Sequence, residues 1–257
     1  MDTWKLTLEY DGTRYSGWQE QRNATTVQGL VRAAAEGFLE DRVEIGGAGR
    51  TDAGVHALGQ VAHMRLHVRV KPRELLYGIN DRLPADVNVL AVEPAPRRFH
   101  ARHDAVARSY VYQIATRRTA FGKRYVWWVR DALDEGAMRR AAGLFAGRHD
   151  FVAFSQKGEP GASTVVVVEE SRVERCGDLL VYRVVASHFL WRMVRRLVGA
   201  IVAAGRGELT EGDLERMLET GKGTVAEITA PPSGLFLEQV VYSRDETRRP
   251  FGPATGV

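Results

Sequence analysis

The sequence lacks the features that would mark a secreted or membrane-embedded protein. A single cysteine, Cys176, cannot form an internal disulfide framework, which excludes a small disulfide-stabilised scaffold. No run of eighteen apolar residues occurs, so the sequence contains no candidate transmembrane helix. The N-terminal residues form a strand-like pattern rather than a signal peptide. We therefore expect a cytoplasmic protein with no membrane partner.

Motifs for bound metals and nucleotides are missing as well. The glycines at 46, 47 and 49 are not followed by the Gly-Lys-Ser/Thr ending of a phosphate-binding loop. His63 and His67 are four residues apart, but they lie in a strand-like segment and lack the glutamate of the zinc-protease motif. The residues therefore predict neither a metal site nor a nucleotide cofactor.

Lysine is scarce, and the basic residues are clustered. Only five of the 36 basic residues are lysine, and the net charge is +4. Residues 97–130 carry eight arginines and one lysine against one acid, Asp104, so this window is +8 and the rest of the chain −4. A second stretch, 188–207, contains four arginines and no acid. Composition bias can explain the preference for arginine but explains the clustering less well. Because aromatic residues are interleaved with both stretches, they resemble a nucleic-acid-binding surface.

The pattern of apolar residues predicts two copies of one element order, βαββαβ. In the first copy the strands cover about 4–10, 43–48, 59–68 and 87–93, and the helices 26–40 and 72–81. In the second copy the strands cover 109–116, 164–174, 179–187 and 235–243, and the helices 134–145 and 189–204. Two such copies predict an α+β fold with two tandem ferredoxin-like halves and antiparallel sheets. We expect the halves to span 1–104 and 105–243, followed by a flexible tail over 244–257.

Local signals refine these expectations. Pro72 fits the first turn of a helix, and Asp134 and Thr210 precede helical windows as capping residues. Four consecutive valines over 165–168 predict a well-buried central strand. The basic and aromatic residues 117–131 predict a long loop.

The segment most indicative of chemistry is residues 49–57, Gly-Arg-Thr-Asp-Ala-Gly-Val-His-Ala. Its glycines permit a sharp bend and a close backbone approach, so Asp52 can face a ligand. The structural alternative is a surface turn in which Asp52 caps backbone N–H groups and pairs with Arg50.

This segment resembles the signature of the tRNA pseudouridine synthase A family, and further motifs follow in the family's order. They are Tyr10-Asp11-Gly12-Thr13, Gly17-Trp18-Gln19, Val27-Gln28-Gly29, Phe99-His100-Ala101-Arg102, Ala107-Arg108-Ser109-Tyr110-Val111-Tyr112, Asp150-Phe151 with Phe154-Ser155, Phe189-Leu190 with Met193-Val194-Arg195, and Pro232-Ser233-Gly234-Leu235-Phe236-Leu237. The resemblance spans roughly residues 4–243. It implies a homodimer whose subunits each contain two ferredoxin-like halves with a central basic cleft.

The resemblance also implies a reaction, the isomerisation of uridine to pseudouridine at positions 38–40 in the anticodon stem-loop of tRNA, without a cofactor. Asp52 matches the family's nucleophile, Tyr110 its active-site tyrosine, and Arg195 the arginine that pairs with the catalytic aspartate. Arg50 resembles the residue that extrudes the target nucleotide, and Leu235 an apolar residue that packs against the base. Helical spacing places Arg192 and Arg196 near Arg195, as further substrate-binding candidates or as one basic helix face.

Three questions stay open at this level. Strand alternation puts Tyr110 and Tyr112 on one face, and only the family match favours Tyr110. The attack of Asp52 at C6, its attack at C1′ and a transient glycal are all compatible with the sequence. A synthase of the same superfamily with another RNA target, and a tRNA-binding protein without activity, are the alternative functions.

Overall fold

The computed structural model describes residues 2–156 and 161–255. It divides the chain into two compact units. Unit 1 comprises Met1–Val106 and Leu237–Thr247, and unit 2 comprises Ala107–Phe236 and Arg248–Val257. The boundary expected after residue 104 lies two residues from this division, and residues 237–243, which the pattern assigns to the second half, cluster with unit 1.

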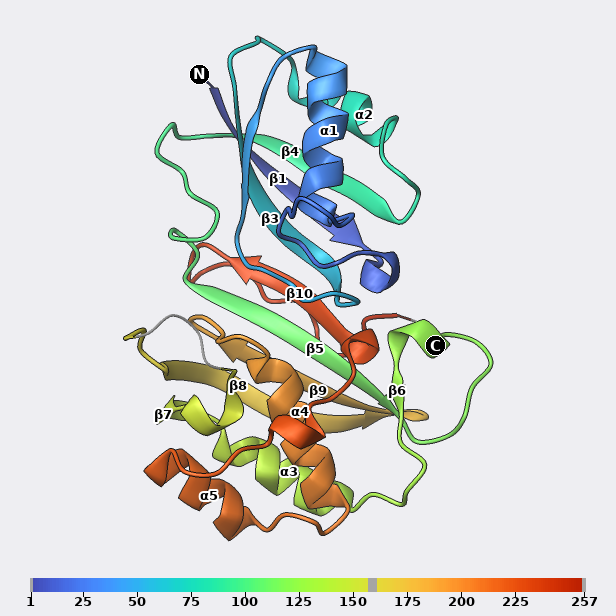
Figure 1. The fold of residues 1–257 in the computed structure, drawn as a ribbon, viewed down its shortest axis with the longest axis vertical. Coiled ribbons are helices and arrows are strands. Elements are labelled where there is room, and N and C mark those ends of the chain that lie inside the picture. The colour runs from blue at the N-terminus through green and yellow to red at the C-terminus, as the bar shows by residue number, and fades with distance from the viewer. Residues whose placement is uncertain (1, 157–160, 256–257) are drawn as a thin grey trace. The chain divides into compact units, whose positions relative to one another are not determined.

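Unit 1 has the predicted βαββαβ order. Its elements are β1 (Asp2–Tyr10), α1 (Val27–Leu39), β2 (Glu44–Gly47), β3 (His56–Leu66), α2 (Pro72–Asn80) and β4 (Val87–Ala95). The strands lie in the order β4-β1-β3, with β2 also paired to β3, and all of these pairs are antiparallel. Both helices lie on one side of the strands (Figure 1).

The sequence explains these elements locally. Along β1 the side chains of Trp4, Leu6 and Leu8 are buried at alternate positions, so one face of the strand joins the core. Thr26 caps α1, because its side chain accepts a hydrogen bond from the Gly29 N–H. Pro72 begins α2, where its missing N–H costs no hydrogen bond.

Unit 2 repeats the order with additional elements. These are β5 (Ala107–Ala115), β6 (Trp127–Trp128), α3 (Glu135–Leu144), β7 (Gly147–Asp150), β8 (Val165–Cys176), β9 (Leu179–Ala186), α4 (Met193–Gly205), α5 (Glu211–Thr220) and the start of β10 (Leu235–Val241). The main strands are antiparallel in the order β5-β9-β8-β7, and β6 pairs with β5 in parallel. From Leu237 onward β10 belongs to unit 1. Among the described residues, no helix combines the length and apolar character that crossing a bilayer requires.

Two predicted helix caps in unit 2 are confirmed. Asp134 accepts a hydrogen bond from the Ala137 N–H at the start of α3. Thr210 and Asp213 form a reciprocal capping box at the start of α5.

Two expectations need correction, and two short strands were missed. The helix predicted from 189 begins at Met193, because Arg192 has φ 60° and cannot be part of a right-handed helix. The valine run is not a well-buried central strand, since Val167 is 44% exposed and only two of the four valines, Val166 and Val168, are buried. Strands β6 and β7, which are only two and four residues long, were not predicted from the pattern.

The C-terminal segment packs against unit 2 instead of extending as the expected flexible tail. Phe251 and Ala254 pack against a buried cluster that includes Val111. The Ala254 N–H donates to the Gln113 Oε1 at 2.8 Å, and the Arg172 guanidinium lies 4.2 Å from the centre of the Phe251 ring. Residues 256 and 257 of the predicted tail lie outside the described residues.

Candidate active site

The loop that carries Asp52 connects β2 to β3 in unit 1, and backbone hydrogen bonds define its path. The Trp18 N–H donates to the Thr51 carbonyl at 3.1 Å, and the Gly54 N–H donates to the Tyr15 carbonyl at 3.3 Å. The Val55 N–H donates back to the Asp52 carbonyl at 3.1 Å, which closes a tight turn. The segment 11–18 therefore supports the loop along its length.

Side chains from the sheet add two further contacts to the loop. The Tyr10 hydroxyl and the Thr51 Oγ1 share a hydrogen bond of 2.9 Å, and the Gln60 Nε2 donates to the Gly49 carbonyl at 3.1 Å. Burial raises the pKa of Tyr10 to about 12, so this hydroxyl stays neutral at physiological pH. Both bonds hold the backbone on either side of Arg50.

Two glycines allow the supporting segment to approach the loop closely. A Cβ at Gly12 would lie 1.9 Å from the Val55 carbonyl oxygen, and a Cβ at Gly17 would lie 2.4 Å from the Thr51 carbonyl oxygen. Gly17 also has φ 88°, which favours glycine. The Asp-Gly-Thr and Gly-Trp motifs are thus part of the packing that positions Asp52.

His56 is a supporting residue that our interpretation of the sequence did not single out. It is 1% exposed, and its Nδ1 accepts a hydrogen bond from the Gly12 N–H at 3.0 Å. The same nitrogen lies 3.1 Å from the Asp11 Oδ1. The only sequence signal was its place four residues after Asp52, inside the signature segment.

Asp52 is half-buried, whereas Arg50 is exposed. The Arg50 Nε donates to the Gln19 Oε1 at 3.2 Å. Within the described part of the chain, Arg50 forms no ion pair with Asp52, so the surface pair required by the structural alternative is not formed. The loop therefore presents a carboxylate and a guanidinium as separate groups.

In unit 2 the two candidate tyrosines of β5 have different surroundings. The Tyr112 hydroxyl donates to the Pro231 carbonyl at 2.8 Å, and its ring is fully buried. Burial raises the pKa of Tyr112 well above its usual value, an effect that the charge of Arg195 partly offsets. Tyr110 instead lies edge to face with Phe189 at a centroid distance of 4.9 Å. Tyr112 is thus engaged in the core of unit 2.

The three candidate arginines near α4 do not form one basic helix face. The Arg195 Nε donates to the Ala230 carbonyl at 2.7 Å. Arg192 precedes the helix and lies over the Trp191 ring, 5.6 Å from its centre. Arg196 is 8% exposed and donates to the Ser155 carbonyl, and burial lowers its pKa. Of these three, only Arg192 is fully accessible to a phosphate.

Leu235 is 5% exposed and follows the 3-10 turn η5 (Pro232–Gly234). A Cβ at Gly234 would lie 2.6 Å from the Tyr112 ring, so only glycine allows this turn to pack there. Tyr112 thus positions Leu235, because its hydroxyl bonds to the Pro231 carbonyl and its ring packs on Gly234.

The chemistry available is nucleophilic and acid–base. Unit 1 carries the Asp52 carboxylate, and unit 2 carries the phenol of Tyr110 and the guanidinium of Arg195. The described residues contain no group of three or more His, Cys, Asp or Glu side chains arranged to hold a metal ion.

A family model and the sequence relatives identify one family. The family model described as tRNA pseudouridine synthase matches residues 7–104 and 141–243. A tRNA pseudouridine synthase A of Allorhizobium ampelinum is 40% identical over 256 residues, covering 98% of this chain and 99% of the relative. Proteins with the same name from a Thermoanaerobacter species and Chlorobaculum tepidum are 36% and 40% identical, over 92% and 93% of this chain and 98% of each relative.

Proposed function

This chain belongs to the tRNA pseudouridine synthase family, and on that premise we propose that Asp52 is its nucleophile and that its target uridines lie at positions 38–40 in the anticodon stem-loop. The activity itself is the isomerisation of uridine to pseudouridine in tRNA. The observation that carries the proposal is the Asp52 loop, whose backbone is tied to Tyr15 and Trp18 while its arginine bonds to Gln19. A half-buried carboxylate on a rigid turn suits covalent catalysis.

The reaction requires few protein groups. The N1–C1′ bond of uridine breaks, the uracil turns over, a C5–C1′ bond forms, and the C5 proton is lost while N1 gains one. No oxidant, reductant or co-substrate enters this balance. A nucleophile, a base and an enclosing pocket are sufficient. Attack at C6, attack at C1′ and a route through a glycal would each use the Asp52 carboxylate or its charge.

We assign the remaining roles by the groups' surroundings and the family resemblance. Tyr110 is the base that removes the C5 proton, a role that Tyr112 cannot share because its hydroxyl donates to the Pro231 carbonyl. Arg195 supplies a positive charge, which favours the ionised form of a carboxylate nucleophile. Leu235 packs against the target base, and Arg192 contributes to RNA binding, whereas the buried Arg196 has only a supporting role through the Ser155 carbonyl.

Tritium release from tRNA that contains 5-tritiated uridine tests the nucleophile. We expect Asp52→Asn to bind tRNA with unchanged affinity and to release no tritium, because the amide has the same shape but cannot attack as an anion. Asp41→Asn is the matched control, because Asp41 is a surface carboxylate whose side chain bonds to the neighbouring Arg42 N–H. Measurable tritium release above background by Asp52→Asn would contradict the assignment.

The same assay separates the competing substrates. Transcripts in which only the uridine at position 38, 39 or 40 carries tritium should release it, whereas labelled ribosomal RNA should not. Release from ribosomal RNA at an equal rate would favour a synthase with another RNA target.

We further propose that the enzyme acts in the cytoplasm as a homodimer. The family resemblance and the single cysteine support this proposal. Light scattering should give twice the chain mass of 28.6 kDa. A mass of 28.6 kDa at micromolar concentration would refute the dimer.

A further inference from the structure

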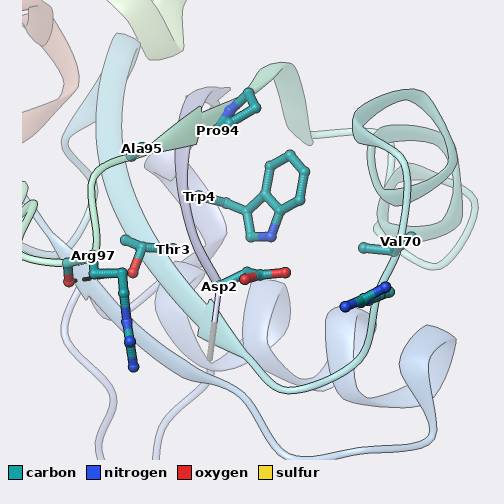
Figure 2. Close-up of a pocket in the computed structure, with 8 residues that line it drawn as sticks. Asp2, Thr3, Trp4, Val70, Pro94, Ala95 and Arg97 are labelled. Carbon is teal, nitrogen blue, oxygen red and sulfur yellow. Dashed lines mark hydrogen bonds between the residues drawn. The ribbon is translucent and has the colours of Figure 1, made fainter.

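Unit 1 contains a pocket at the end of its sheet opposite to Asp52. Its volume is about 430 Å³, and its lining residues come from the start of β1, the segment between β3 and α2, and the end of β4 (Figure 2). Across β1 and β3, Asp2 pairs with Leu66 and Tyr10 with Ala57. Eight residue steps at about 3.3 Å each place the two ends of β1 roughly 26 Å apart. Since Tyr10 bonds to Thr51, the pocket is remote from the Asp52 loop.

The pocket contains a buried donor without an acceptor. Trp4 is 7% exposed, and none of the described residues offers its Nε1 a hydrogen-bond acceptor. Figure 2 shows the nitrogen edge of this indole facing the side of the pocket where Asp2 lies. A buried N–H without a partner destabilises the fold, because it has lost its hydrogen bond to water. An oxygen atom of a ligand in the pocket would remove this penalty.

Two arginines at the pocket are available for the same ligand. Arg69 and Arg97 are both exposed, and neither guanidinium has a hydrogen bond or ion pair within residues 2–156 and 161–255. Thr3 holds the backbone of Arg97, because its hydroxyl donates to the Arg97 carbonyl at 3.4 Å (Figure 2). Pro94 lies opposite Trp4 on β4 and donates no backbone N–H.

These features define the ligand chemically. The indole and both guanidiniums donate hydrogen bonds only, so the ligand must present acceptors. Two arginines and Asp2 give the lining a net charge of +1, which matches the single negative charge of a phosphodiester. The volume exceeds that of one phosphate group and leaves room for an attached ribose.

We propose that this pocket binds a backbone phosphodiester of the tRNA substrate, at a position remote from the uridine that reacts. The inference rests on tRNA being the substrate but not on the identity of the nucleophile. The contact is independent of base sequence, so it contributes affinity and orientation rather than selectivity for a particular base. Its loss therefore changes tRNA binding and leaves the chemical step intact.

The indole N–H provides a direct readout of occupancy. Full-length protein labelled with ¹⁵N-tryptophan has five indoles, and Trp4→Phe identifies the Trp4 signal. An affinity tag belongs at the C-terminus, because Asp2 lines the pocket. We expect the Trp4 signal to shift saturably with tRNA and with the dinucleoside phosphate uridylyl-uridine, but not with equimolar inorganic phosphate. A Trp4 signal that stays in place while tRNA saturates the enzyme would overturn the proposal.

Affinity measurements test the arginines. We expect the double variant Arg69→Gln/Arg97→Gln to bind tRNA about tenfold more weakly and to lower the steepness of the salt dependence by about one. The matched control is Arg42→Gln/Arg73→Gln, two exposed arginines of unit 1 that do not line the pocket. Equal losses in both double variants would show a general charge effect and overturn the proposal.

Turnover distinguishes this inference from the assignment of Asp52. The double variant should keep the wild-type kcat at saturating tRNA and show only a raised KM. Loss of kcat with unchanged affinity in the double variant would overturn the proposed remote contact. Activity of Asp52→Asn would contradict only the assignment of the nucleophile and leave the pocket proposal untouched.

Discussion

At the scale of single residues, Arg50 and Asp52 are two positions apart, and we propose separate tasks for them. Arg50 is exposed and donates to Gln19 through its Nε alone. Its terminal nitrogens are therefore available to a phosphate or to the space that an extruded base leaves. This arrangement supports the extrusion role and removes the surface ion pair as an explanation for the residue.

Replacing Arg50 by lysine tests this role, because the charge remains while the planar fork is lost. We expect Arg50→Lys to slow single turnover at least about tenfold on a paired stem uridine, and less on an unpaired loop uridine, which is easier to extrude. Gln19→Ala, which removes only the partner, should have a smaller effect. Equal slowing on both uridines, with a lowered melting temperature, would return Arg50 to a structural role.

His63 makes the stability of unit 1 sensitive to acid. It is 3% exposed, its Nδ1 accepts a hydrogen bond from the Ala101 N–H at 3.2 Å, and its ring centre is 4.5 Å from that of His100. Burial, followed by the charges of His100 and Arg65, lowers the pKa of His63 from 6.5 to about 4, and Glu44 and Asp104 oppose the shift. The folded protein therefore keeps this ring neutral at pH values at which an unfolded chain would protonate it.

The sign of the pH dependence follows from proton binding. Between pH 6.5 and 4 the unfolded state binds the proton and the folded state does not, so stability is complete above pH 6.5 and declines as the pH falls toward 4. At about 1.4 kcal/mol per pKa unit, the loss is at most about 3.5 kcal/mol. Urea unfolding across this range should show the decline. We expect His63→Gln, which keeps an acceptor but cannot titrate, to flatten it, and an unchanged slope would contradict this prediction.

At the scale of elements, the start of α4 combines backbone strain with a candidate RNA contact. Arg192 and Glu40 are the two non-glycine residues with positive φ, at 60° and 53°, in the described parts of the chain. Glu40 is the C-cap of α1, where a left-handed residue is common. At Arg192 the left-handed conformation directs the chain into α4 while the side chain lies over Trp191. Strain that persists at such a position indicates a functional constraint.

Glycine substitutions separate strain from function. We expect Arg192→Gly and Glu40→Gly each to raise the free energy of unfolding, by up to about 1 kcal/mol, because glycine adopts positive φ without steric cost. Only Arg192→Gly should weaken tRNA binding. If its affinity equals that of Glu40→Gly, Arg192 does not contact the RNA.

At the scale of the whole molecule, charge is distributed unevenly along the chain. Residues 97–130 carry a charge of +8, although the net charge of the chain is only +4. This window includes exposed residues of both units, among them Arg97, Arg118 and Lys123. Such a distribution favours a polyanionic partner over other proteins or small neutral ligands.

The salt dependence of tRNA binding measures how many phosphates this charge contacts. Each phosphate contact adds about 0.7 to 0.9 to the slope of the logarithm of affinity against the logarithm of salt concentration. The proposed dimer has two such windows and should contact several phosphates. We therefore expect a slope steeper than about −3 between 50 and 200 mM salt. A slope near zero would show that the basic window does not face RNA.

Much of the fold was predictable because its signals are local. Helix α1 follows from the Thr26 cap, and α2 from Pro72. The βαββαβ order of unit 1 follows from periodic burial along the chain. The Asp52 loop could be identified from its glycines and its signature residues. Each of these features depends on neighbouring residues, whose conformational preferences the sequence itself determines.

Other features depended on contacts between distant residues. Only the tertiary structure showed that Arg50 bonds to Gln19, that the Tyr112 hydroxyl bonds to Pro231, and that the last residues pack on Gln113. Likewise, the single valine run spans exposed and buried positions, because burial depends on what covers a strand. The pocket at Trp4 brings together segments about 65 and 90 residues apart along the chain. No local sequence pattern predicts this pocket, because the pairing of the strands determines which distant side chains lie together at their ends.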